Sequence, residues 1–121
     1  MTGAESVLVV DDDEDLITLE AQILESGGYQ VRTARDGREA LDRVAEEMPR
    51  LIFLDMRMPR MDGTEFAREF RTRYGPACCP IVVVTADENA LVRARQVGAQ
   101  ACFPKPFDLD ELLEITARFV S

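Results

Sequence analysis

The sequence LIFLDMRMPRMDG, residues 51–63, carries the strongest signal for the fold of this chain. Its first four residues, Leu51 to Leu54, form an apolar run that predicts a strand buried on both faces of a parallel sheet. Asp55 follows this run directly. A carboxylate at the mouth of a buried strand needs solvent, a cation or hydrogen-bond donors, because an unpaired buried charge is strongly unfavourable. Asp55 is therefore a candidate for chemistry.

On either side of this stretch, short apolar runs alternate with segments of helical periodicity. The predicted strands are Val7–Val10, Gln30–Ala34, Leu51–Leu54, Ile81–Val84 and Ala101–Phe103. The predicted helices carry apolar stripes at Leu16, Leu19, Ile23 and Leu24, at Ala40, Leu41, Val44, Ala45 and Met48, at Phe66, Ala67, Phe70 and Tyr74, over residues 89–97, and over Asp108–Val120. Glycine or proline follows each of the first four helices and marks its end.

Five strands alternating with five helices predict an α/β fold. Parallel neighbours require crossover connections, so we expect one doubly wound five-stranded parallel sheet with helices on both faces. The length of 121 residues suits a single domain over residues 1–121. The carboxyl ends of all the strands then share one edge, and ligands of such sheets bind there.

Composition excludes several classes of function. The formal net charge is −9, which argues against direct binding to nucleic acid or to an anionic membrane. No apolar run reaches membrane-spanning length, and the first residues do not resemble a targeting signal, so we expect a cytoplasmic protein. The chain has three cysteines and no histidine, which excludes the familiar zinc spacings and histidine-based catalytic triads. We interpret the cysteines as buried or loop thiols.

Polar residues stand just past four of the predicted strands: the acidic run Asp11-Asp12-Asp13, then Asp55, Thr85 and Lys105. We expect the side chains of these residues to face one another at the carboxyl edge of the sheet. Clustered carboxylates repel by ~1 kcal/mol per pair at 4 Å in water and ~4 kcal/mol at an effective dielectric of 20, so a cation is favoured. Oxygen ligands without His or Cys indicate Mg²⁺. A lysine and a hydroxyl opposite could bind phosphoryl oxygens, which suits phosphoryl transfer onto a carboxylate.

Four motifs in this arrangement carry a family resemblance that spans about the whole chain. They are residues 9–12 (VVDD), residues 54–56 with 58–63 (LDM and MPRMDG), residues 84–86 (VTA) and residues 104–107 (PKPF). With these motifs in this order, the chain resembles the receiver domain of bacterial response regulators. The resemblance implies a flavodoxin-like fold with strand order 2-1-3-4-5.

The resemblance also implies a magnesium site. Asp12 would ligate the ion directly, and Asp11 would help through water or as a second carboxylate. Asp55 would contribute a further oxygen. The backbone carbonyl of Arg57 would complete the protein's share of the ligands.

A phosphoacceptor role follows from the same resemblance. Asp55 would receive a phosphoryl group from a phosphohistidine on a sensor histidine kinase or phosphotransfer protein. Thr85 would bond a phosphoryl oxygen and move inward. Lys105 would pair with Asp55 before phosphorylation and with the phosphoryl group afterwards. The domain would promote its own phosphorylation and dephosphorylation and act as a switch for partner binding, not as a turnover enzyme.

Each of these residues also has a plainer interpretation when it is considered alone. The acidic residues Asp13, Glu14 and Asp15 suit a solvated helix start, where negative charge is favourable. Thr85 could simply finish a β-rich strand, and Lys105 could be a surface lysine. Only their joint placement at one edge favours the functional interpretation.

Two positions qualify the resemblance. Cys102 stands three residues before Lys105, where the family usually carries Tyr or Phe, and a thiol cannot act as that rotating aromatic side chain. The coupling of phosphorylation to the fourth helix, fifth strand and fifth helix is therefore open. The side chain of Arg57 is a second hypothesis, since it could project over the site and alter the access of hydrolytic water.

Two other functional classes remain as alternatives. Asp62-Gly63-Thr64 resembles part of the motif of haloacid dehalogenase-type phosphohydrolases, but that motif needs an Asp at position 60, which is Arg here. The other alternative is a pseudo-receiver that binds partners without being phosphorylated. The sequence does not distinguish a stand-alone receiver from a piece of a larger regulator or hybrid kinase, and it does not identify the kinase or the output.

Overall fold

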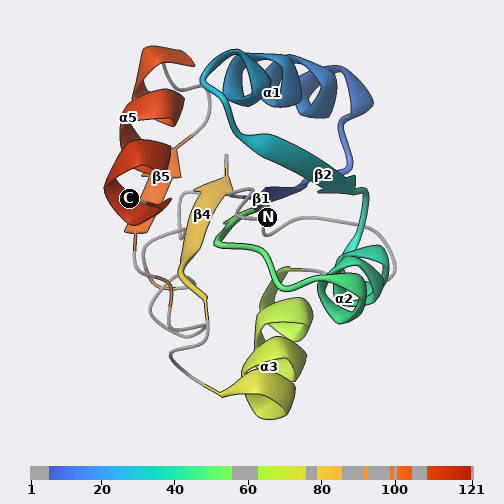
Figure 1. Ribbon diagram of the computed structural model, residues 1–121. Helices are drawn as coiled ribbons and strands as arrows, with labels where there is room; N and C mark the ends of the chain where they lie inside the picture. Colours follow the sequence, from blue (N-terminus) through green and yellow to red (C-terminus); the bar gives the residue numbers. More distant parts are fainter. Residues whose placement is uncertain are drawn as a thin grey trace.

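The computed structural model describes residues 6–55, 63–75, 79–85, 92, 99, 101–104 and 109–120. Its five strands are β1 (Ser6–Val10), β2 (Gln30–Ala34), β3 (Leu51–Leu54), β4 (Ile81–Thr85) and β5 (Ala101–Pro104). The helices in this part of the chain are α1 (Glu14–Ser26), α2 (Gly37–Glu46), α3 (Gly63–Tyr74) and α5 (Leu109–Val120). Figure 1 shows them in sequence colours.

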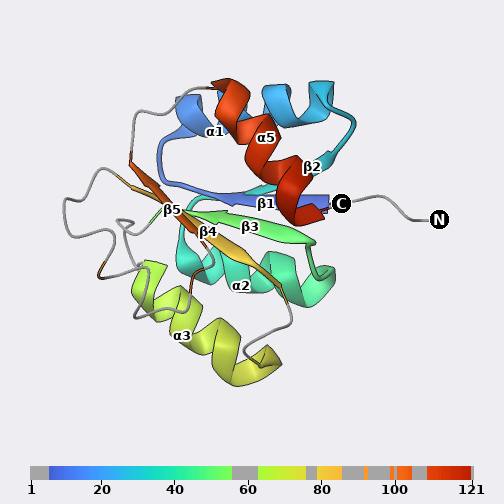
Figure 2. The ribbon, with the colours of Figure 1, turned by 90° about the vertical axis from the view of Figure 1, so that its left-hand side faces the viewer.

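The strands form one parallel sheet in the order β2-β1-β3-β4-β5. Helices α1 and α5 cover one face of the sheet, and α2 and α3 cover the other (Figure 2). The predicted α/β class, parallel pairing and strand order are confirmed. Four helices, not the predicted five, occur among the described residues, because the prediction for residues 89–97 lies almost wholly outside them.

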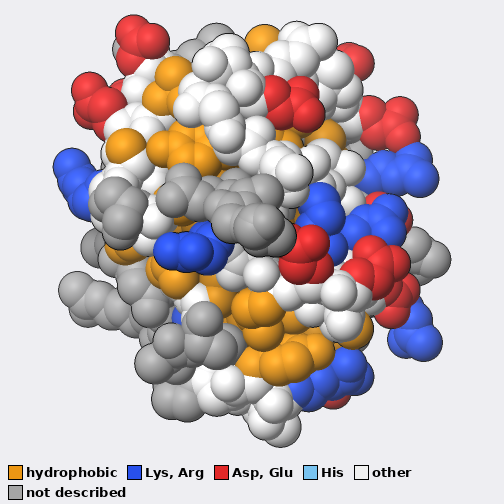
Figure 3. Space-filling view, in the orientation of Figure 1, with side chains coloured by type: hydrophobic (Ala, Val, Ile, Leu, Met, Phe, Trp, Pro, Cys, Tyr) orange, Lys and Arg blue, Asp and Glu red, His pale blue; other side chains and the backbone are white. Residues whose placement is uncertain are grey.

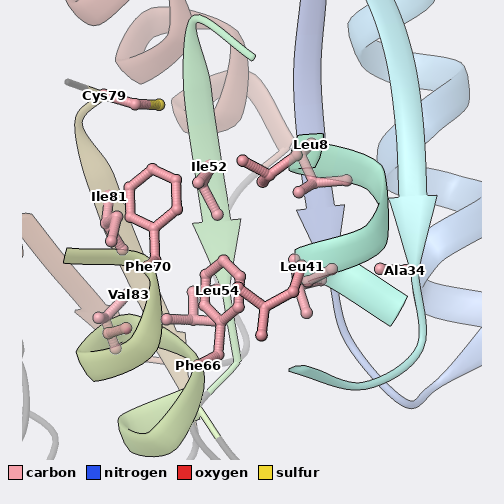
Figure 4. Packing of buried hydrophobic residues seen from close by; sticks show 14 residues of the cluster. Leu8, Ala34, Leu41, Ile52, Leu54, Phe66, Phe70, Cys79, Ile81 and Val83 are labelled. Carbon is pink, nitrogen blue, oxygen red and sulfur yellow. The ribbon is translucent and has the colours of Figure 1, made fainter. Parts of the chain in front are cut away.

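Two apolar cores sandwich the sheet, because every position of β1 and β3 is buried and successive side chains point to opposite faces. On the α2 and α3 face, Leu8, Val10, Ile52 and Leu54 pack with Phe66 and Phe70, as Figure 4 shows for most of the cluster. On the other face, the alternate residues of the same strands pack with Ile17, Leu24, Leu112 and Ile115. The apolar runs thus place β1 and β3 at the centre of the sheet.

Aspartate side chains cap the starts of α1 and α2. The side chain of Asp13 accepts hydrogen bonds from the backbone N–H groups of Asp15 and Leu16, at 3.1 and 3.2 Å. The side chain of Asp36 accepts one from the N–H of Glu39 at 2.8 Å. These bonds satisfy N–H groups that lack partners inside the helix. The interpretation of residues 13–15 as a helix start is confirmed.

The predicted apolar stripe of α1 was wrong in part. Leu19 is 41% exposed, whereas Ile17, Glu20 and Leu24 are the buried residues of this helix. The buried glutamate interrupts the apolar periodicity on the true inner face, so the pattern suggested a rotated helix. The predicted stripe of α2 was also wrong in part, because Ala45 is exposed although it lies within the helix, and Met48 lies past the helix end at Glu46 and only borders the core.

No helix in the described part of the chain is both long and apolar enough to span a membrane. Cys79 is buried as a thiol, with its Sγ 3.4 Å from the carbonyl oxygen of Pro80. This agrees with the interpretation of that cysteine. Cys78 and the Cys102 side chain lie outside the description.

Candidate metal and phosphoacceptor site

Asp55 lies where the sequence predicts it, directly after β3 at the carboxyl edge of the sheet. Its backbone N–H donates to the carbonyl oxygen of Val10 at 2.9 Å, which continues the pairing of β3 with β1 by one residue. The residue is only 6% exposed. A buried carboxylate is thus held by the main chain of the sheet beside the end of β1.

Asp11 reaches the same edge from β1. Its backbone N–H donates to the carbonyl oxygen of Ala34 at 3.0 Å, so the backbone is fixed against β2. Its Oδ1 accepts a hydrogen bond from the N–H of Asp13 at 3.0 Å. Asp11 is 3% exposed, whereas its neighbour Asp12 is exposed. The carboxylate of Asp11 therefore lies on the buried side of the site, and that of Asp12 lies on the solvent side.

The side chains of Asp11, Asp12 and Asp55 converge. One carboxylate oxygen from each can be chosen so that all three lie within 4.8 Å of one another. Three carboxylates at this separation repel unless a cation lies among them, and an all-oxygen donor set with a solvent-exposed side suits Mg²⁺, which keeps several waters. The residues present therefore fit a magnesium ion.

Of the remaining predicted site residues, only the backbone of Thr85 belongs to the described part of the chain. Thr85 ends β4, and its backbone is in register with Pro104 of β5, so β4 and β5 end at the same edge as β1 and β3. The side chain of Thr85 is outside the described part, as are Arg57 and Lys105. Lys105 nonetheless follows Pro104 directly in the sequence. The roles of these three residues stay predictions.

An ion pair missed by the sequence analysis lies beside the acidic loop. Arg35, directly after β2, pairs with Glu14 at the start of α1, and both side chains are well exposed. Arg35 follows Ala34, whose carbonyl oxygen accepts the hydrogen bond from the N–H of Asp11. The ion pair therefore links the β1–α1 and β2–α2 connections near the carboxylates. The partners are 21 residues apart, and no local pattern connects them.

Comparison with known proteins defines the class. Residues 7–117 match the family model of the response regulator receiver domain. The chain belongs to this family and is a receiver domain of two-component signalling. This assignment favours the receiver interpretation over the phosphohydrolase alternative, in agreement with the parallel sheet and the acidic cluster.

Individual relatives agree with the family assignment. The response regulator MprA of Mycolicibacterium vanbaalenii is 42% identical over 109 residues, which cover 88% of this chain and 46% of the relative. The chain thus spans about half the length of the curated relatives it matches.

Solved structures of similar proteins show the same fold. The chemotaxis protein CheY4 of Vibrio cholerae is 32% identical, with a TM-score of 0.88 over 97% of this chain and 99% of that chain. The receiver domain of NtrX from Brucella abortus is 34% identical, with a TM-score of 0.84 over 94% and 97%.

Proposed function

We propose that Asp55 is the phosphoacceptor of this receiver domain and that Mg²⁺ is required for its phosphorylation. The observation that carries the proposal is the convergence of Asp11, Asp12 and Asp55 at the carboxyl edge of the sheet. A carboxylate that must react with a dianionic phosphoryl group needs local positive charge, because like charges otherwise repel. A bound Mg²⁺ would supply that charge.

In the proposed reaction a carboxylate oxygen of Asp55 attacks the phosphorus atom of a phosphohistidine. The P–N bond to the imidazole breaks, and its electron pair returns to the ring nitrogen. The new P–O bond leaves an aspartyl phosphate on Asp55. The hydrogen bond from the N–H of Asp55 to the carbonyl oxygen of Val10 fixes Asp55 at the end of β3. The sheet therefore positions the nucleophile for the reaction.

The magnesium ligands in this proposal are the side chains of Asp11, Asp12 and Asp55 with the backbone carbonyl of Arg57. Asp11 is oriented by the N–H of Asp13, which donates to its Oδ1 at 3.0 Å. Thr85 and Lys105 would bind phosphoryl oxygens from the β4 and β5 ends of the same edge. Family resemblance, not a measured contact, supports the roles of Arg57, Thr85 and Lys105.

We further propose that residues 1–121 form one cytoplasmic receiver domain and that the donor is a sensor histidine kinase or phosphotransfer protein. Phosphorylation would switch the affinity for an output partner. The acceptor would then promote its own phosphorylation and dephosphorylation. The match to about half of longer response regulators supports an output outside this stretch of chain. Negative charge disfavours a direct nucleic-acid target.

The experiment that tests the phosphoacceptor is incubation with Mg²⁺ and a small phosphodonor, followed by intact mass measurement. We expect one phosphoryl adduct on the wild type and none on Asp55→Asn. Asp42→Asn on α2 is the matched control, because Asp42 is an exposed aspartate outside the acidic cluster. An unmodified wild-type chain would support the pseudo-receiver alternative, and an equal adduct on Asp55→Asn would place the phosphoryl group elsewhere.

A second experiment addresses the metal. We expect Asp12→Asn to raise the Mg²⁺ concentration needed for half-maximal phosphorylation by roughly tenfold or more, since even outer partners of metal ligands typically change metal affinity by about 10- to 100-fold. Asp15→Asn is the control, because Asp15 belongs to the same acidic segment but lies outside the cluster. Equal Mg²⁺ dependence of the two variants would remove Asp12 from the ligand set.

A further inference from the structure

Strand β2 lies at one edge of the sheet and pairs only with β1 among the described strands. The N–H of Asp11 donates to the carbonyl oxygen of Ala34, so Ala34 directs its backbone groups toward β1. Because this direction alternates along a strand, Arg32 also faces β1, whereas Val31 and Thr33 direct their N–H and C=O groups to the outer edge. Such groups are a template for pairing with another chain.

Two arginines connect this edge to α2. The Nε of Arg43, on α2, donates to the outward carbonyl oxygen of Thr33 at 3.2 Å. In return, Arg32 on β2 donates to the carbonyl oxygens of Arg43, at 2.7 Å, and of Glu47. We call these two arginines and the three carbonyl groups they bind the arginine clasp. The bonds from Arg32 satisfy carbonyl groups at the end of α2, where positive charge is also favourable.

Acidic side chains hold the arginine clasp in place. Arg43 lies 3.9 Å from Glu39 and 3.5 Å from Glu46, and Arg32 lies 3.8 Å from Glu46. Exposed pairs of this kind each contribute little, but together they restrict the two guanidinium groups. The side chain of Arg32 is only 22% exposed, so its position is also set by packing.

Access to the edge is controlled at Thr33. A groove of about 380 Å³ between α1, β2 and α2 is lined by Thr18, Thr33, Arg35 and Arg43, among others. In this groove the guanidinium of Arg43 occupies the carbonyl oxygen of Thr33, which is an acceptor that a strand pairing with the outer edge of β2 would use. A charged group on the edge also opposes the approach of a second strand.

We propose that the arginine clasp keeps β2 from pairing with β2 of a second copy of this chain. The two edges would meet about a two-fold axis as antiparallel strands, because identical edges are then self-complementary. The outward groups of Val31 and Thr33 would form the new bonds. This device concerns the edge of the sheet and is independent of phosphorylation at Asp55.

The test is the self-association of Arg43→Met, measured by light scattering after size-exclusion chromatography over a range of concentrations. Methionine keeps the unbranched aliphatic part of the side chain and loses the donors and the charge. We expect self-association to be stronger than in the wild type by about tenfold, the equivalent of one lost hydrogen bond. Arg38→Met is the matched control on α2, since Arg38 is exposed and lies outside the arginine clasp; we expect it to behave as the wild type.

Two more variants separate edge pairing from general loss of stability. Val44→Ala removes a buried side chain from α2 without touching the arginine clasp, and we expect no added association. Adding Val31→Pro to Arg43→Met should restore the molar mass that the wild type shows in light scattering. Proline removes an outward N–H that pairing between two β2 edges requires. Should Arg43→Met not fold, Arg43→Leu, which also loses the donors and the charge, carries the same test.

The proposal is overturned by any of three results. The first is a folded Arg43 variant whose mass equals that of the wild type at every concentration. The second is association of Val44→Ala as strong as that of the Arg43 variant. The third is association that persists after Val31→Pro is added.

Discussion

The two faces of the sheet differ in the side chains that form their cores and in the charge of the helices that cover them. The core under α2 and α3 contains Phe66 and Phe70, whose ring centroids are 5.7 Å apart, and Tyr74 continues the series at 5.4 Å. The core under α1 and α5 contains the buried ring of Phe53 among aliphatic side chains and includes buried polar side chains at Glu20 and Thr116. One face therefore has a series of contacting aromatic rings, and the other combines aliphatic side chains and the ring of Phe53 with polar groups.

Surface charge follows the same division. Helix α1 has acidic residues and no Lys or Arg, whereas α2 and α3 carry both signs in ion pairs such as Arg43–Glu39 and Arg73–Glu69. In the space-filling view, acidic side chains predominate over α1 and α5, and Lys or Arg side chains gather beside β2 and α2 (Figure 3). One central sheet therefore supports two layers with different physical chemistry.

The largest effect is expected from Phe70→Ala on the aromatic face. Phe70 is fully buried between its two ring neighbours, so its removal should lower the free energy of unfolding by about 3–5 kcal/mol. Urea unfolding measures this loss. Thr72→Ala, an exposed position of the same helix, should change stability by less than about 0.5 kcal/mol. A larger loss in Leu112→Ala, on the aliphatic face, would contradict the comparison.

The next effect tests the rotation of α1 on the aliphatic face. Ile17→Ala should cost about 2 kcal/mol because Ile17 is 8% exposed and belongs to the core. Leu19→Ala should change the free energy of unfolding by less than about 0.5 kcal/mol because Leu19 points mainly to solvent. Chemical denaturation of both variants under the same conditions provides the measurement. A reversed order would mean that α1 packs as the apolar periodicity predicts.

Helix capping gives a smaller contrast between the faces. Asp36, at the start of α2, is buried, and Asp13, at the start of α1, is exposed. Asp36→Ala should cost about 1–2 kcal/mol, since the partly buried N–H of Glu39 then loses its acceptor, and Asp13→Ala only about 0.5–1 kcal/mol, since water can replace the cap. Thermal unfolding of the two variants checks the order, and equal losses would show that burial of the cap is unimportant here.

The smallest effects concern the two glycines that end α1. Gly28 has a φ of 95°, so Gly28→Ala should cost about 1 kcal/mol through backbone strain. A Cβ at Gly27 would lie 2.7 Å from Cδ2 of Leu113 on α5, so the Leu113 side chain would have to shift. Since alanine also stabilises by about 0.4–1 kcal/mol through the unfolded chain, Gly27→Ala should change stability by less than about 1 kcal/mol. A loss well above that of Gly28→Ala would show that α1 and α5 cannot separate at this contact.

Much of the fold could be predicted from local signals. Continuous apolar runs mark β1, β3 and β4, because strands covered on both faces need apolar residues at every position. The boundaries of β2 and β3 coincide with the predicted ones. The rotation of α1 could not be predicted, because Glu20 stands on the inner face and only the surrounding helix and sheet show that this position is buried.

The candidate site shows the same division. Asp11, Asp12 and Asp55 could be predicted to meet, because each follows a parallel strand and parallel strands end at one edge. The bond from the N–H of Asp13 to Asp11 and the ion pair of Arg35 with Glu14 could not, since they depend on how two connections approach each other. The roles of Arg57, Thr85 and Lys105 stay predictions from the family resemblance.

Local sequence patterns were enough to predict the class of fold, the order of its elements along the chain and the carboxylates at the sheet edge. They were enough because apolar periodicity, caps and strand ends are properties of neighbouring residues. The packing of the whole domain was needed to establish which face of α1 is buried, how Asp11 and Asp12 differ in exposure, and how Arg32 and Arg43 bind at the edge of β2. Those properties depend on groups that are distant in the chain and become neighbours only when the sheet and its helices pack together.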